Sequence, residues 1–264
     1  MRKREAPSGA SSRIERLFFI PDTHIPYEDK RAVALMFDAL EHFKPDTVVI
    51  MGDWIDCLAV SHWSKDPRRA LTLDQEVEKA GQYLDRIEAA KKIYIAGNHE
   101  DRLQRYLQEK APQLLPFCDI PSLLELDRRG WQYVPYKSST TIGKIHLTHD
   151  VGSAGRYNVF KTLDSFQASV VTAHTHRFAQ VVEGDALGGC QVSSQFGWLG
   201  DVEQVDYMHK INAKRNWALG MGYGYHHRAT GYVYLFPAPI VNYTVAVEGT
   251  ILGRPNKKRK TVTT

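Results

Sequence analysis

The segment IERLFFIPDTH, residues 14–24, decides the fold of this 264-residue chain. Its first seven residues are rich in β-branched and aromatic side chains, as in a buried strand. Similar runs follow at 46–51 and 92–96, and amphipathic helical patterns separate the three runs. This order predicts parallel strands joined by crossover helices, with ligands at the carboxyl ends of the strands.

Polar side chains follow each of these three predicted strands directly. The parallel arrangement brings them to one edge of the sheet. They are Asp22, His24, Asp53, Asp56, Asn98 and His99.

The second half of the chain is rich in short strand-like runs, which predict a second sheet in the same domain. Two of these runs, 144–148 and 169–173, also end at imidazoles, namely His149 and the pair His174 and His176. We expect the Gly/Tyr-rich stretch 220–225 to be a loop.

Composition and charge predict a soluble globular protein with basic ends. Hydrophobic residues make up 43% and charged residues 24% of the chain. The net charge of +4 divides into +3 for residues 1–13, +5 for 254–264 and −4 for 14–253. We therefore expect a disordered basic N-terminal tail, a folded domain over 14–253 and a basic C-terminal tail. The three unpatterned cysteines and the lack of a long apolar run predict a cytoplasmic protein outside the membrane.

The residue types that gather at the predicted sheet edge favour a metal site. Imidazoles and carboxylates suit borderline divalent cations such as Mn²⁺, Fe²⁺ and Zn²⁺. Asn98 is a weak, neutral ligand that is unusual at a single structural zinc. Its presence, with His99 left over, indicates a catalytic centre with two metal ions.

The five motifs together resemble the calcineurin-like metallophosphoesterases, whose pattern runs D-x-H, G-D-x-x-D, G-N-H-[DE], H and G-H-x-H. The resemblance spans about residues 16–177. It implies a four-layer α/β/β/α sandwich, in which two mixed sheets face each other and helices flank them. It also implies two divalent ions, with Mn²⁺ preferred and Fe²⁺, Zn²⁺ or Ni²⁺ as alternatives.

The same resemblance assigns a role to each motif residue. One metal would be held by Asp22, His24, Asp53 and His176. The other would be held by Asp53, Asn98, His149 and His174. Asp53 would bridge the two ions, and a metal-bridging hydroxide would attack the phosphorus. His99 would protonate the leaving group while Asp56 orients it.

Two departures from the family pattern bear on the substrate. Ala173 replaces the usual glycine of the last motif, which adds one methyl group. Cys57 stands where protein Ser/Thr phosphatases carry an arginine that clamps a phosphomonoester. The stretch 53–69 and Asn216-Trp217 are similar to small metallophosphoesterases of phages and prophages.

We therefore expect a phosphodiesterase that acts on nucleotides or nucleic acid. The alternatives are a phosphomonoesterase for small molecules or proteins, and a non-catalytic binding scaffold on the same fold.

Nucleic acid is a candidate partner because the stretch 198–232 interleaves aromatic with basic side chains. The opposing interpretation is that its rings pack the end of the second sheet. The basic tails offer a further, sequence-independent attraction to phosphates. The candidate substrate-binding residues are Arg68, Arg69, Trp217, Tyr225 and His226.

Overall fold

The structure is a computed structural model that describes residues 14–61, 71–184, 186, 188–204 and 216–255. The expected N-terminal tail, most of the C-terminal tail, and the candidate residues Arg68 and Arg69 lie outside these ranges. Within the described chain, no helix combines the length and apolarity that crossing a bilayer requires.

The first sheet contains six strands in the described part of the chain, in the order β11-β10-β1-β2-β3-β4. Neighbouring strands from β1 to β4 run parallel, whereas β10 and β11 are antiparallel to their neighbours. The strands are β1 (Ile14–Ile20), β2 (Thr47–Ile50), β3 (Lys91–Ile95), β4 (Trp131–Val134), β10 (Gly220–His227) and β11 (Tyr232–Pro239).

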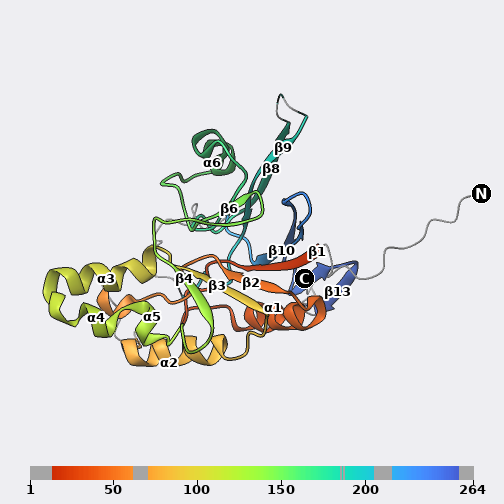
Figure 1. Cartoon of the computed structure of the whole chain (residues 1–264). Helices are drawn as coiled ribbons and strands as arrows, with labels where there is room; N and C mark the ends of the chain where they lie inside the picture. Colours follow the sequence, from red (N-terminus) through yellow and green to blue (C-terminus); the bar gives the residue numbers. More distant parts are fainter. Residues whose placement is uncertain (1–13, 62–70, 185, 187, 205–215, 256–264) are drawn as a thin grey trace, which may run out of the picture.

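Helices cover the outer face of this sheet (Figure 1). The long ones are α1 (Lys30–Phe43), α2 (Leu73–Leu84) and α3 (Asn98–Lys110). Shorter turns are η1 (Leu58–Val60), η2 (Pro112–Leu114), α4 (Leu115–Cys118) and α5 (Ile120–Leu123). Successive side chains of a strand alternate between faces. Phe18 therefore packs toward the helices, and its neighbour Phe19 packs toward the second sheet.

The second sheet has five strands among the described residues, in the order β5-β6-β7-β9-β8. They are β5 (Thr140–Ile142), β6 (Ile145–Leu147), β7 (Val170–Thr172), β8 (Phe178–Gly184) and β9 (Cys190–Phe196). Helix α6 (Asn158–Phe166) packs against β7, β8 and β9, and the hairpin of β12 (Thr244–Val247) and β13 (Thr250–Gly253) packs against α1. The expected α/β fold with two facing mixed sheets flanked by helices is confirmed.

The predicted loop at 220–225 is wrong, because these residues form strand β10 between β1 and β11. Its glycines are required by the second sheet rather than by a turn. A Cβ at Gly222 would overlap the ring of Phe196, and one at Gly220 would overlap the ring of Phe178. Alternating glycines thus allow aromatic rings of one sheet to lie directly on the backbone of the other.

Substitution of Gly222 by alanine should lower the free energy of unfolding by about 1–3 kcal/mol, because the new methyl group overpacks the space that Phe196 fills. Gly184→Ala is the matched control. This glycine also lies in a strand, and its nearest neighbour to a new Cβ is 4.0 Å away. Urea denaturation measures both variants. Equal stability of the two would contradict the proposed packing.

Candidate metal centre

Five loops meet where the strands of the two sheets end. The loops after β1, β2 and β3 supply residues from the first sheet, and the loops after β6 and β7 supply His149, His174 and His176 from the second. Asp22, His24 and Asp53 are at most 1% exposed. The structure thus brings together the seven side chains that the motifs nominated as metal ligands.

Two glycines make this close approach possible. Gly52 has φ of +102°, and a Cβ there would overlap the imidazole of His149. A Cβ at Gly97 would overlap the carboxylate of Asp53. Only a residue without a side chain fits at either position. The glycines of the G-D and G-N-H motifs therefore leave room for a neighbouring ligand.

Four of the seven side chains project from left-handed backbone. The φ values are +54° at His24, +49° at Asp53, +69° at His174 and +58° at His176. Residues with a Cβ adopt this region rarely, and each instance costs roughly 1–2 kcal/mol. Strain of this kind concentrates at functional sites. The chain thus adopts strained turns at positions where they bring these side chains together.

The first group consists of Asp22, His24, Asp53 and His176, whose ligand atoms lie within 4.8 Å of one another. The Nε2 atoms of His24 and His176 are 3.0 Å apart. Asp22 Oδ1 lies 3.6 Å from His176 Nε2, and Asp53 Oδ2 lies 3.9 Å from His24 Nε2. Two carboxylates and two imidazoles therefore face a common point.

The second group shares Asp53 with the first and adds His149 and His174. Asp53 Oδ2 is 3.4 Å from His149 Nε2. Asn98 Oδ1 lies 3.0 Å from the same nitrogen and 2.8 Å from His174 Nδ1. Asp53 is thus the residue common to two adjoining sets of donor atoms.

Hydrogen bonds outside the centre fix which imidazole nitrogen faces it. His149 Nδ1 donates to the carbonyl oxygen of Met51 at 2.9 Å, and His24 Nδ1 donates to Asp56 Oδ2 at 3.1 Å. In the neutral form of each ring, the Nε2 lone pair then points into the centre. Metal-bound histidines are oriented by such outer hydrogen bonds.

The electrostatics of the centre favour a bound positive charge. Burial raises the pKa of Asp53, but the imidazoles of His149 and His99 outweigh it and lower this pKa well below its ordinary value. Burial lowers the pKa of His149, yet the carboxylate of Asp53 raises it to about 10 overall. Converging lone pairs and a buried carboxylate that draws positive charge fit two divalent cations sharing Asp53.

His99 and Asp56 form a pair beside the centre. His99 Nδ1 lies 2.9 Å from Asp56 Oδ2, and His99 Nε2 lies 3.8 Å from Asp53 Oδ2. Asp56 Oδ2 also accepts a hydrogen bond from His24 Nδ1. His24, Asp56 and His99 are close enough to hold a cation by themselves. However, Asp56 already accepts a hydrogen bond from His24 and pairs with His99, so the trio fits a role in orienting these imidazoles better.

Arg102, which the motifs did not reveal, contacts both members of this pair. Its Nη1 donates to Asp56 Oδ1 at 3.1 Å, and its Nη2 lies 2.9 Å from His99 Nε2. Arg102 follows His99 by three residues on α3 and so shares its face of the helix. A guanidinium therefore reaches the region that Cys57 was expected to leave uncharged. Cys57 itself is buried, and burial raises the pKa of its thiol.

Glu100, the last residue of the G-N-H-[DE] motif, is the second residue at the centre to which the motifs assigned no role. Its buried carboxylate accepts hydrogen bonds from the backbone N–H groups of Gly97, Asp53 and Trp54 at 2.8–3.0 Å. The hydroxyl of Tyr94 donates to it as well, at 2.8 Å. Glu100 thereby ties the loop after β3 to the loop that carries Asp53.

The candidate substrate residues are separated by the fold. Trp217 lies at the centre, with its ring edge-on to His176 at 4.3 Å and close to Trp198. The structure does not bring Tyr225 and His226 there. His226 pairs with Glu15 at the start of β1, the opposite end of the strand from Asp22.

The ring of Tyr225 packs against Phe43 and Phe236, and its hydroxyl donates to Glu248. Trp198 is 2% exposed and stacks on His176. Among the described aromatics of 198–232, these contacts favour packing over base stacking.

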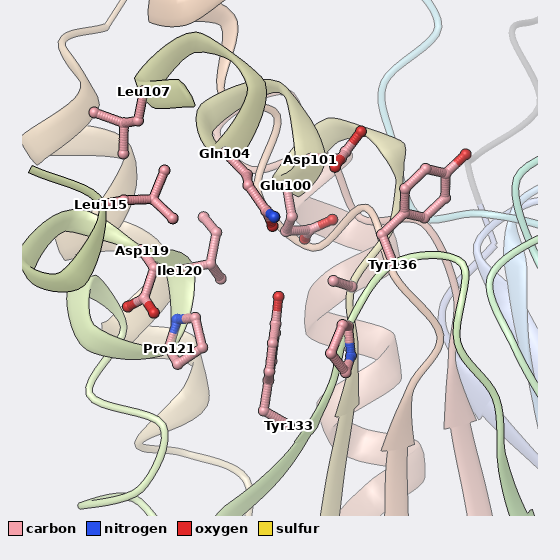
Figure 2. A pocket seen from close by; sticks show the side chains of 12 residues that line it. Glu100, Asp101, Gln104, Leu107, Leu115, Asp119, Ile120, Pro121, Tyr133 and Tyr136 are labelled. Atoms are coloured by element: carbon pink, nitrogen blue, oxygen red, sulfur yellow. The ribbon is translucent and has the colours of Figure 1, made fainter. Parts of the chain in front are cut away.

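A pocket of about 220 Å³ lies behind the loop after β3, between α3, α5 and β4. Figure 2 shows the hydroxyl of Tyr133 pointing into it toward Glu100 and Gln104, with Ile120 and Leu115 on the apolar side. Burial raises the pKa of Tyr133, and the nearby carboxylate of Glu100 raises it further, so its hydroxyl stays neutral.

Comparison with known proteins finds a matching family model and related phage proteins. The Calcineurin-like phosphoesterase family model matches residues 15–239. The Gene 54 protein of Mycobacterium phage D29 is 28% identical over 229 residues, covering 79% of this chain and 88% of that protein. The Gene 54 protein of Mycobacterium phage L5 is 26% identical over 228 residues, with 78% and 87% covered.

Among solved structures, Chaetomium thermophilum Vps29 aligns with a TM-score of 0.48 and 12% identity, over 91% of this chain and 100% of that one. This resemblance is remote and adds nothing to the family assignment. The match over 15–239 decides it, and it spans all the loops that form the centre. The chain belongs to the calcineurin-like phosphoesterases.

Proposed function

We propose that this protein is a phosphodiesterase whose centre holds two divalent metal ions, with Mn²⁺ preferred and oligonucleotides or nucleotides as substrates. The observation that carries the proposal is the carboxylate of Asp53, shared by two sets of donor atoms within reach of His99. Asp22, His24, Asp53 and His176 would hold one ion. Asp53, Asn98, His149 and His174 would hold the other. When bound, the ions would polarise the phosphoryl oxygens and lower the pKa of the attacking water.

His99 is the proposed general acid for the departing alkoxide. Its Nδ1 lies 2.9 Å from Asp56 Oδ2 as an ion pair, which leaves Nε2, 3.8 Å from Asp53 Oδ2, as the atom that delivers a proton. Burial lowers the pKa of His99, and the carboxylates of Asp53 and Asp56 more than reverse this effect. The acid therefore sits where carboxylates favour its charged form.

Arg102 and a protonated His99 exclude each other in the present arrangement. The guanidinium donates toward His99 Nε2, which requires a free lone pair on that nitrogen. Once Nε2 carries a proton, the guanidinium must turn to another acceptor. A phosphoryl oxygen of the bound substrate is suitable, since guanidinium groups bind phosphates well. We propose that, when the substrate binds, the guanidinium of Arg102 releases His99 Nε2 and binds a phosphoryl oxygen of the substrate.

A phosphomonoesterase is the second candidate function, and Arg102 is the observation that favours it. A dianionic monoester gains most from nearby cations, and Arg102 supplies one close to where protein phosphatases place theirs. The diester remains preferred because Arg102 is partly neutralised by Asp56.

Matched chromogenic substrates separate these functions. Purified protein with Mn²⁺ should hydrolyse bis(p-nitrophenyl) phosphate with higher kcat/KM than p-nitrophenyl phosphate, and chelation should abolish both activities. A higher value for the monoester would favour the second candidate. The absence of metal-dependent hydrolysis on either ester would contradict both enzymatic functions and leave the binding scaffold.

Replacing His99 by alanine should lower kcat by about 10²- to 10⁴-fold for a diester with an alkyl leaving group, as expected for loss of a general acid. The loss should be much smaller for a p-nitrophenyl leaving group, which departs without a proton. His42→Ala, at an exposed position in the last turn of α1, is the control and should change neither rate. Equal losses for both leaving groups would rule out His99 as the acid.

A further inference from the structure

A groove runs along the outer face of α3 and leads away from the metal centre. Its volume is about 370 Å³, and its described walls are α3, Val60 at the end of η1 and Ser61. The helix contributes Arg102, Arg105, Tyr106, Glu109 and Lys110. These positions lie on the face of α3 opposite to the one that lines the pocket of Figure 2.

The groove begins beside the pair of His99 and Asp56. Arg102 at its inner end is hydrogen-bonded to Asp56 and lies 2.9 Å from His99 Nε2. Lys110 lies eight residues further along α3, which corresponds to about 12 Å of helix. That length corresponds to about three phosphate steps of one strand at the duplex rise of ~3.4 Å per step. A chain held at the centre could therefore continue along α3.

The described part of the groove is positively charged, although the body of the protein is acidic. Arg102, Arg105 and Lys110 oppose a single lining carboxylate, Glu109. Arg105 also pairs with Asp101 at 3.0 Å, but its side chain is 55% exposed. Exposed pairs of this kind contribute little, so Arg105 can turn to a phosphate at low cost.

Tyr106 gives the groove an aromatic surface between its cations. The residue is 44% exposed, although large aromatic side chains are usually well buried. An exposed ring flanked by an arginine and a lysine is the combination used to bind single-stranded nucleic acid, in which the ring stacks on a base and the cations contact phosphates.

We propose that the α3 groove binds the continuation of a single-stranded oligonucleotide whose scissile phosphate lies at the metal centre. Arg105 and Lys110 contact phosphates beyond the scissile one, and Tyr106 stacks on a base. The proposal rests on the proposed phosphodiesterase function and names its substrate class. It also transfers the expected nucleic-acid contact from Tyr225 and His226 to α3.

The test measures binding of a fluorescein-labelled tetrathymidylate by anisotropy, with EDTA present so that no turnover occurs. Arg105→Ala/Lys110→Ala should weaken binding at least tenfold and reduce the slope of log Kd against log salt by about 1.4, or about 0.7 for each phosphate contact. Tyr106→Ala should weaken binding about tenfold, and Tyr106→Phe should restore it. Hydrolysis of bis(p-nitrophenyl) phosphate should remain unchanged in all three variants.

Arg128→Ala/Lys161→Ala is the matched control, because it removes one arginine and one lysine from exposed positions outside the groove. It should bind like the wild type. A tetrathymidylate with uncharged methylphosphonate linkages should bind the wild type no better than it binds the Arg105/Lys110 variant. Unchanged binding by that variant, equal wild-type affinity for the two oligomers, or no measurable wild-type binding would each overturn the proposal. Failure to hydrolyse diesters would count against the phosphodiesterase alone, since the binding assay needs no turnover.

Discussion

The buried carboxylate of Asp53 is the group on which the rest of the centre depends. It faces His24, His99 and His149, and its Oδ1 accepts the backbone N–H of His99 at 2.9 Å. The carbonyl of the same residue accepts the N–H groups of Thr23 and His24. One residue thus connects the loops after β1, β2 and β3, while its charge requires nearby positive charge because burial otherwise penalises it.

The fold accepts local strain to hold this arrangement. Asp53 has left-handed backbone, and Glu100 fixes its N–H from the start of α3. The second sheet docks through the backbone N–H of His174, which donates to Asp22 at 3.0 Å. The imidazoles of the second sheet therefore reach the carboxylates of the first because the loops are bonded to each other directly. Bound cations would strengthen a convergence that the backbone has already established.

The motif residues could be predicted from the sequence because each lies immediately after a strand with a recognisable pattern. The positions of Arg102 and of Tyr225 could not. Arg102 reaches the centre only because α3 begins at Asn98, so that His99 and Arg102 lie on one face of the helix. Tyr225 and His226 lie far from it because β10 runs antiparallel to β1, which places them at the opposite end of that strand. Neither the helix start nor the strand pairing leaves a periodic pattern, and the glycines of β10 resemble a loop.

The metal content of the purified protein tests the central role of Asp53 most directly. After reconstitution with Mn²⁺ and removal of excess ion, mass spectrometry of the metal should find two ions per chain in the wild type. The exposed Asp38→Asn variant on α1 should also retain two. Asp53→Asn should retain far less than one, because both donor sets lose their shared carboxylate, whereas Asp22→Asn should retain about one. One ion or none in the wild type, or two in Asp53→Asn, would contradict a dinuclear centre built around this residue.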